Sequence, residues 1–290
     1  MSDYVLITDS TNDLPADAVQ EADVIVMPMT FTIGEISYKN YPDHRELSPK
    51  DFYQMMRDGA VPTTVQLTPS NLCDFFEPYL QKGLDILYLA FSSALSGTYA
   101  SGLLAAEEMM KKYPDRRIAV IDSRCASLGE GLFAYLAGCR RKKGASFDEL
   151  QKWILENRLT ICHWFTVDHL KYLKRGGRIS SASAMVGTAL QIKPLIYVDD
   201  EGRLIPKEKI KGRKNSIEAL LKKMEATGVN LQEQTVIVGH ADAMEEAQYL
   251  KKEIAARFHP RKIIVGYIGP VIGAHVGPGM AAVLYVGKRL

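Results

Sequence analysis

The chain has 290 residues and a formal net charge of +2, from 36 basic and 34 acidic residues. This length usually exceeds what one hydrophobic core holds, so we expect two packed domains with a cleft between them. The balanced charge argues against a general attraction to nucleic acid, and no apolar run in the sequence approaches a membrane span.

The cysteines and the N-terminus indicate the compartment. Cys73, Cys125, Cys139 and Cys162 show neither CxxC spacing nor a Cys/His zinc pattern, which predicts reduced, mostly buried thiols and no bound metal. The first residues contain no basic segment followed by a long apolar core. We therefore expect a soluble, cytoplasmic protein without a metal or cofactor.

Residues 1–157 alternate strand and helix patterns, which predicts an N-terminal α/β domain with a largely parallel sheet and flanking helices. Apolar runs predict strands at 4–9, 22–31, 85–91 and 117–122, and a hairpin over 31–38. Helix starts are predicted at Ser48-Pro49, at Thr68-Pro69 and at the capping pair Ser146 and Glu149.

Residues 158–290 predict a second α/β domain with a mixed sheet. Strands are predicted at 159–167, 234–240, 262–268 and 280–287, with a hairpin over 192–208 that turns at 200–202. Apolar stripes predict one helix after Asn215 and another after the capping pair Asp242 and Glu245.

Polar residues follow three strands of the first half. They are Asp9 to Thr11, the serines of "SSALSGT" with Ser96 and Thr98, and Asp122 with Ser123. The carboxyl ends of parallel strands share one edge, where ligands of α/β sheets bind and helix N-termini attract anions. Each residue alone is typical of a helix cap, but three such groups together favour a site.

Several enzyme classes lack their motifs. The sequence has no GxxxxGK[ST] phosphate loop, no GxSxG elbow and no HExxH pair. The match Gly277, Gly279 and Ala282 to a dinucleotide motif lies too near the end of the chain to open a nucleotide-binding unit. A serine-dependent acyl hydrolase or transferase, with a histidine brought close by the fold, stays open, as does a binding protein for a small anion.

Two further stretches stand out. Residues 267–283 crowd glycines and prolines around His275, which predicts a tight irregular loop and a polar contact of His275 at the cleft. Residues 171–223 hold 13 Lys/Arg against 5 Asp/Glu. That basic stretch is either a solvated face or a docking surface for an acidic partner or an anionic bilayer.

These segments resemble the DegV family of fatty-acid-binding proteins, the lipid-carrying subunits of bacterial fatty acid kinase. The resemblance spans nearly the whole chain and rests on six ordered segments: "ITDSTNDLP", "SSALSGTYASG", "VIDSRCASLGEGL", "YLKRGGRIS" running on to "GTALQIKPLI", "GHADAMEEA" and "IGPVIGAHVGPG". It implies a long-chain fatty acid in a tunnel between the two α/β domains.

The resemblance also implies the site residues. The fatty-acid carboxylate would bind Thr64, Ser96 and His275, and Arg178 would lie near the head group. Separately, within the basic stretch 171–223, Arg213 is expected to contact the partner. The family commonly has Thr-Ser-Gln-Pro where this chain has Thr64-Val65-Gln66-Leu67. Val65 and Leu67 therefore suggest an altered tunnel wall, and the adjacent Thr63 is an alternative to Thr64.

The activity implied by the resemblance is presentation rather than catalysis. A separate ATP-dependent kinase subunit would phosphorylate the bound carboxylate, giving an acyl phosphate for phospholipid synthesis. The expected partners are that kinase subunit and, transiently, an anionic membrane surface. No nucleic-acid partner is expected.

Overall fold

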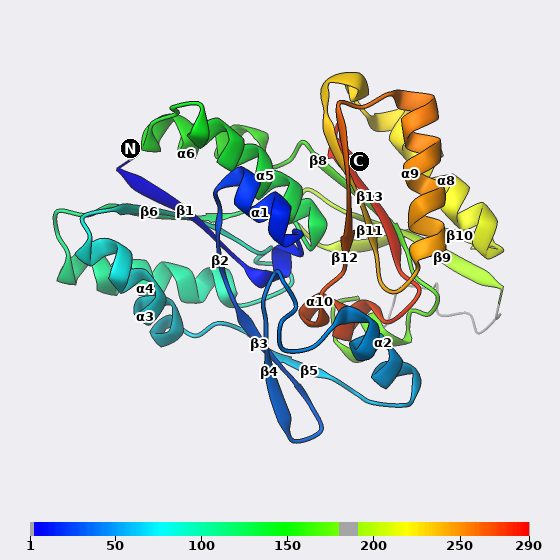
Figure 1. Ribbon diagram of the computed structural model, residues 1–290, viewed down its shortest axis with the longest axis horizontal. Helices are drawn as coiled ribbons and strands as arrows, with labels where there is room; N and C mark the ends of the chain where they lie inside the picture. The colour runs from blue at the N-terminus through cyan, green and yellow to red at the C-terminus, as the bar shows by residue number, and fades with distance from the viewer. Residues whose placement is uncertain (1–2, 180–190, 290) are drawn as a thin grey trace.

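A computed structural model describes residues 3–179 and 191–289 of the chain (Figure 1). Residues 187–190 of the "GTALQIKPLI" segment lie outside the described residues. The described strands form sheets of four, six and three strands. The predicted fold class, a largely parallel N-terminal sheet with flanking helices followed by a mixed sheet, is confirmed.

The four-stranded sheet is entirely parallel, in the order β2-β1-β6-β7. Its strands are β1 (Tyr4–Asp9), β2 (Ile25–Met27), β6 (Asp85–Ala90) and β7 (Ile118–Asp122). In Figure 1, α3 and α4 lie on one side of this sheet, and α1, α5 and α6 on the other. These helices are α1 (Ala16–Ala22), α3 (Pro69–Gln81), α4 (Thr98–Lys112), α5 (Leu128–Lys142) and α6 (Phe147–Asn157).

The six-stranded sheet is mixed, in the order β10-β9-β8-β13-β11-β12, and only β11 and β12 pair in parallel. Its strands are β8 (Ile161–Thr166), β9 (Ile192–Val198), β10 (Leu204–Lys211), β11 (Thr235–His240), β12 (Lys262–Tyr267) and β13 (Ala281–Val286). The helices α8 (Arg213–Thr227) and α9 (Met244–Phe258) cover one face of this sheet (Figure 1).

A small antiparallel sheet, β4-β3-β5, completes the fold. Its strands are β3 (Met29–Ile33), β4 (Ile36–Asn40) and β5 (Thr63–Val65). The remaining helical segments are η1 (Ser10–Asn12), α2 (Pro49–Arg57), α7 (Lys171–Arg175), η2 (Leu231–Glu233) and α10 (Pro270–Val276).

Side-chain alternation along the six-stranded sheet separates two hydrophobic cores. Trp164 and Val283 pack under α8 and α9 in the smaller core. Phe165 and Leu284, the next residues on the same strands, join the larger core together with Leu6 of the four-stranded sheet. The larger core therefore continues from one sheet to the other.

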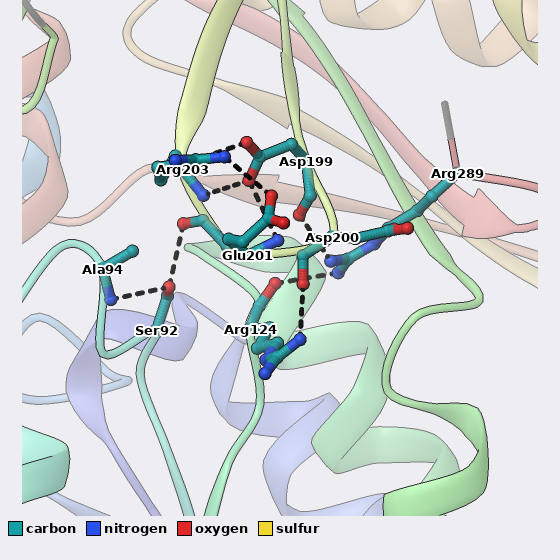
Figure 2. A network of polar contacts seen from close by, with 9 residues as sticks. Ser92, Ala94, Arg124, Asp199, Asp200, Glu201, Arg203 and Arg289 are labelled. Carbon is teal, nitrogen blue, oxygen red and sulfur yellow. Dashed lines mark hydrogen bonds and ion pairs between the residues drawn. The ribbon is translucent and has the colours of Figure 1, made fainter.

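The β9–β10 hairpin adds a polar contact between the two halves (Figure 2). Backbone carbonyls of its turn accept hydrogen bonds from three side chains: Ser92, which follows β6, Arg124, which follows β7, and Arg289, near the C-terminus. These bonds are Ser92 Oγ to the Gly202 carbonyl at 2.8 Å, Arg124 Nη1 to the Asp200 carbonyl at 2.9 Å and Arg289 Nη1 to the Asp199 carbonyl at 3.0 Å. The hairpin turn is thus held by hydrogen bonds to backbone oxygens.

Most predicted elements are confirmed. Ser48, Thr68 and Ser146 cap α2, α3 and α6 through their hydroxyls, as their sequence patterns predict. The hairpins over 31–38 and 192–208 also form. The strands of the four-stranded sheet all precede residue 158 and those of the six-stranded sheet follow it. The division into 1–157 and 158–290 stays a prediction.

Three predictions of local structure are wrong. The run 22–31 is not one strand, because the chain passes from β2 in the parallel sheet to β3 in the small sheet. Asp242 does not cap α9: it has a φ of 52° and its carboxylate pairs with Arg57 instead. The glycine-rich stretch is not wholly irregular, because α10 occupies its middle, with Pro270 at its first position.

Candidate ligand-binding site

A cavity of about 340 Å³ lies between the four-stranded and six-stranded sheets. This volume falls within the range of about 300–1,000 Å³ that is typical of small-molecule pockets. Its lining is mainly apolar: Met29, Phe91, Leu95, Leu128, Phe165, Leu173, Val198, Leu204, Ile268, Val271, Ile272, Val276, Met280, Ala282 and Leu284. Such a wall suits a hydrocarbon chain.

A polar cluster of Thr64, Ser96, Arg178 and His275 lines the same cavity. The sequence expectation named all four, and they come from four separate segments of the chain: β5, the β6–α4 loop, the residues after α7, and α10. Arg213 lies elsewhere, at the start of α8, where its Nε donates to Glu246 at 2.9 Å. The fold therefore brings four of the five predicted residues to one cavity.

Thr64 and His275 are in direct contact. The Thr64 Oγ1 lies 2.9 Å from the His275 Nε2, although 211 residues separate them. Thr64 is positioned by the pairing of β5 with Phe31 of β3. Thr63, the alternative residue, pairs with Thr32, is exposed, and does not line the cavity.

The protonation of His275 follows from its surroundings. Burial, together with the nearby Arg178 and Arg175 charges, lowers the pKa of His275 to about 4, so the ring is neutral near pH 7. Its Nδ1 is buried without a hydrogen-bond partner. Buried N–H groups without an acceptor are rarer than unpaired acceptors, which places the proton on Nε2. The Nε2–H then donates to Thr64, whose own hydrogen is free to point into the cavity.

Ser96 and Arg178 complete the polar cluster. The Ser96 Oγ accepts from the Thr98 backbone N–H at 3.2 Å and lies 3.0 Å from the Thr98 hydroxyl. When the Thr98 hydroxyl donates to Ser96, the Ser96 hydrogen is available to a ligand. Arg178 uses its Nε on the Leu95 carbonyl at 3.2 Å, which anchors the guanidinium beside the loop that carries Ser96.

Glycines let the backbone approach these side chains closely. A Cβ on Gly176 would overlap the His275 ring, and a Cβ on Gly97 would overlap the Gln66 side chain, whose Oε1 accepts from the Gly97 N–H at 3.2 Å. Val65 also lines the cavity, whereas Leu67 is buried in the larger core. Of the two departures from the family pattern, Val65 is therefore the one at the cavity wall.

Besides Gln66, three other polar residues line the cavity: Thr11, one of the strand-end residues, and Ser127 and His163, which were not predicted as site residues. Ser127 Oγ donates to Asp13 at 2.6 Å. His163 Nε2 accepts from the Ala126 N–H at 3.3 Å, and burial lowers the pKa of His163 well below its ordinary value. These groups are satisfied within the protein, so they offer little to a ligand.

The strand ends do meet at one edge, as predicted, but most of their polar groups hold loops. Asp122 accepts from Ser93 at 2.6 Å, and Ser10 accepts from the Met29 N–H at 2.9 Å. The Thr11 hydroxyl contacts Asp9 and lies 2.9 Å from Glu130. One hydroxyl hydrogen cannot serve two carboxylates, so one carboxyl must keep its proton. Burial indeed raises the pKa of both acids.

The geometry does not favour the serine-dependent acyl hydrolase or transferase. His275 Nε2 is bonded to Thr64, and the described residues show no hydrogen bond between His275 and Ser96. The residues that the structure describes also contain no group of three or more His, Cys, Asp or Glu side chains arranged to hold a metal ion. Within 3–179 and 191–289, no helix is long and apolar enough to cross a bilayer.

The sequence matches the family model described as "Uncharacterised protein, DegV family" over residues 4–288. The chain belongs to the DegV family. A DegV domain-containing protein of Clostridium perfringens is 45% identical over 287 residues, covering 99% of this chain and 98% of that protein.

Solved DegV family structures share the fold. One from Thermus thermophilus, described as binding fatty acid, has a TM-score of 0.87 at 30% identity and covers 98% of this chain and 99% of its own. DegV of Bacillus subtilis, described as a fatty acid binding protein, has a TM-score of 0.85 at 29% identity, covering 99% of this chain and 100% of its own.

Proposed function

We propose that this DegV family protein binds one long-chain fatty acid, with its tail in the cavity and its carboxylate on Thr64, Ser96 and His275. The observation that carries the proposal is a mainly apolar cavity with these hydroxyls and the neutral imidazole gathered on its wall. Arg178 would lie beside the head group. The fatty-acid binding described for the relatives from T. thermophilus and B. subtilis supports the same ligand class.

The tail would supply most of the affinity. Burying hydrocarbon gains about 0.8 kcal/mol per methylene, or about 12 kcal/mol for a sixteen-carbon chain before ordering costs are subtracted. Hydroxyl donors add charge-assisted hydrogen bonds to the carboxylate without forming a full ion pair. The head group would therefore be oriented while it stays available to react.

The protein would act as a carrier rather than as a catalyst. A separate kinase subunit would transfer the γ-phosphoryl group of ATP to a carboxylate oxygen, releasing ADP and leaving an acyl phosphate for phospholipid synthesis. This chain's residues would hold the carboxylate in place for in-line attack. The ligand of the protein would be the fatty acid, with no cofactor.

The basic stretch 171–223 would dock the kinase subunit or, transiently, an anionic membrane surface. Several of its cations are engaged within the protein, including Lys193 with Asp168 and Lys223 with Glu208. Lys171, Lys174 and Arg175 lie on α7, and the Arg175 charge is close enough to His275 to lower the pKa of that histidine. Arg213, in this stretch, would contribute to partner binding from the start of α8.

Native mass spectrometry of protein purified from cells tests the ligand class. We expect a mass increment that matches one long-chain fatty acid and that disappears after delipidation. A cavity that never acquires fatty acid, while it captures a hydrophilic phosphorylated metabolite, would contradict the proposal and favour the small-anion alternative.

A further inference from the structure

The helix α10 carries His275 and forms much of the cavity wall. Its residues Val271, Ile272 and Val276 line the cavity together with His275. The helix has only seven residues, and isolated helices shorter than about 12–15 residues are marginal in water. Contacts with the rest of the protein must therefore fix where α10 lies relative to Thr64.

Two side chains that are distant in the sequence hold the start of α10. The Asp13 Oδ1 accepts from the Gly269 N–H at 2.9 Å, and Gly269 directly precedes α10. The Tyr53 hydroxyl, on α2, donates to the Ile268 carbonyl at 2.7 Å. This carbonyl and this N–H belong to the same peptide unit, which is planar and trans. Hydrogen bonds on its two opposite edges therefore fix the orientation of that unit.

Two glycines bring α10 close to the side chains that hold it. A Cβ on Gly269 would lie 2.7 Å from the Asp13 Oδ1, and a Cβ on Gly273 would lie 2.6 Å from the Tyr53 hydroxyl. Real Cβ atoms do not approach other atoms so closely. Glycine at these two positions therefore allows Asp13 and Tyr53 to reach the backbone of α10 and of the residue before it.

Asp13 also connects α10 to the start of α5, through residues with an uncommon backbone. The Ser127 hydroxyl donates to the Asp13 Oδ2 at 2.6 Å, and Ser127 lines the cavity. Asp13 has a φ of 52° and Ser127 a φ of 51°. Positive φ is uncommon outside glycine, and strained residues of this kind cluster at ligand sites, where the surrounding structure holds them in place.

We propose that Asp13 is a positioning residue for His275: it fixes the peptide unit at the start of α10, and α10 then holds the imidazole against Thr64. Asp13 does not line the cavity, so it would act on a ligand only through α10. The inference rests on the proposed fatty-acid site, since the Thr64–His275 pair would receive the carboxylate of that ligand. A pair that is already formed needs little ordering when the ligand binds, which favours affinity.

Two variants of Asp13 separate its hydrogen bonds from its charge. In Asp13→Asn, the amide oxygen can still accept from Gly269, and the amide nitrogen can donate to the Ser127 hydroxyl. Asparagine tolerates positive φ, and burial raises the pKa of Asp13 well above its ordinary value, which favours a neutral group at this position. Asp13→Ala removes both hydrogen bonds. We therefore expect asparagine to keep His275 in place and alanine to displace it.

Asp23→Ala is the matched control. Asp23 has a φ of 54°, follows the end of α1, and pairs with Arg141. Alanine at this position has the same unfavourable backbone conformation as alanine at position 13, and it also removes a polar contact. Both alanine variants should therefore lower the Tm, whereas only Asp13→Ala should change the surroundings of His275.

The first measurement is an NMR titration of His275 in the full chain without ligand. The wild-type protein, Asp13→Asn and Asp23→Ala should all show His275 titrating near pH 4. In Asp13→Ala the displaced ring gains contact with water, so its titration should move toward pH 6.5. Titration near pH 4 in Asp13→Ala, or an equal shift in Asp23→Ala, would overturn the proposal.

The second measurement is the ratio of fatty-acid affinity to fatty-alcohol affinity in delipidated protein. A purely structural defect weakens both ligands alike, whereas a displaced His275 should lower the ratio about tenfold, because only the acid has a carboxylate to orient. Tyr53→Phe, which keeps the ring but loses the bond to Ile268, should lower the ratio in the same direction. An unchanged ratio in both Asp13→Ala and Tyr53→Phe would refute the role of Asp13. If the wild-type protein binds no fatty acid, the proposed function fails, and the titration of His275 still decides whether Asp13 positions it.

Discussion

Replacing Thr64 by valine tests the polar cluster most sharply. Valine keeps the shape of threonine and suits β5, but it removes the hydroxyl 2.9 Å from His275 Nε2. The bound carboxylate would lose a donor, and the His275 N–H would lose its acceptor. Hydrogen bonds to charged groups contribute about 1.5–3 kcal/mol, which corresponds to a loss of affinity of about tenfold to hundredfold.

The assay is displacement of a fluorescent fatty acid from delipidated protein. Thr63→Val is the control, because Thr63 lies on the same short strand but is exposed. A fatty alcohol of equal chain length provides a second control, since it has no carboxylate. Equal fatty-acid affinity in Thr64→Val and Thr63→Val would refute the assigned role of Thr64, and so would an equal loss of alcohol and acid binding.

Three further predictions concern protonation and the contact between the two halves. NMR should show His275 titrating near pH 4 rather than near its ordinary pKa, because its ring is buried beside cationic groups; titration near 6.5 would contradict the assigned neutral ring. Because burial raises the pKa of Glu130 in the folded protein, the contribution of Glu130 to the free energy of unfolding should fall as pH rises from about 4.3 toward that raised pKa. In Glu130→Gln, the free energy of unfolding measured in urea should fall less with rising pH. An unchanged pH dependence in this variant would contradict the raised pKa of Glu130. Gly202→Ala should lower the free energy of unfolding by about 1–3 kcal/mol, because Gly202 has a φ of 81° and a Cβ there would overlap Ser92. Gly144→Ala is the control for backbone strain alone, because Gly144 has a φ of 95° and open space around it.

The sequence predicted the elements whose signals are local. The caps at Ser48, Thr68 and Ser146 satisfy backbone N–H groups only a few residues away, so their spacing alone reveals them. The Asp242 cap fails because an ion pair with Arg57, 185 residues away, takes the carboxylate. An ion pair between residues so far apart in the sequence cannot be predicted from the residues around Asp242.

The candidate site, too, was predicted from the sequence only in part. Strand-end chemistry pointed to one sheet edge, but it could not show that Asp122 and Ser10 would hold loops while Ser96 faces a cavity. Thr64 was assigned through the family resemblance, whereas the glycine-rich stretch around His275 already predicted a polar contact at the cleft. Nothing in the sequence around either residue predicts that the two contact each other.

A crystal structure of delipidated protein soaked with a long-chain fatty acid tests the central claim most directly. The account predicts a carboxylate within hydrogen-bond distance of the Thr64 and Ser96 hydroxyls, with the tail along Phe165 and Leu284 in the cavity. A fatty acid bound elsewhere on the protein, or bound in the cavity with its carboxylate away from both hydroxyls, would contradict it.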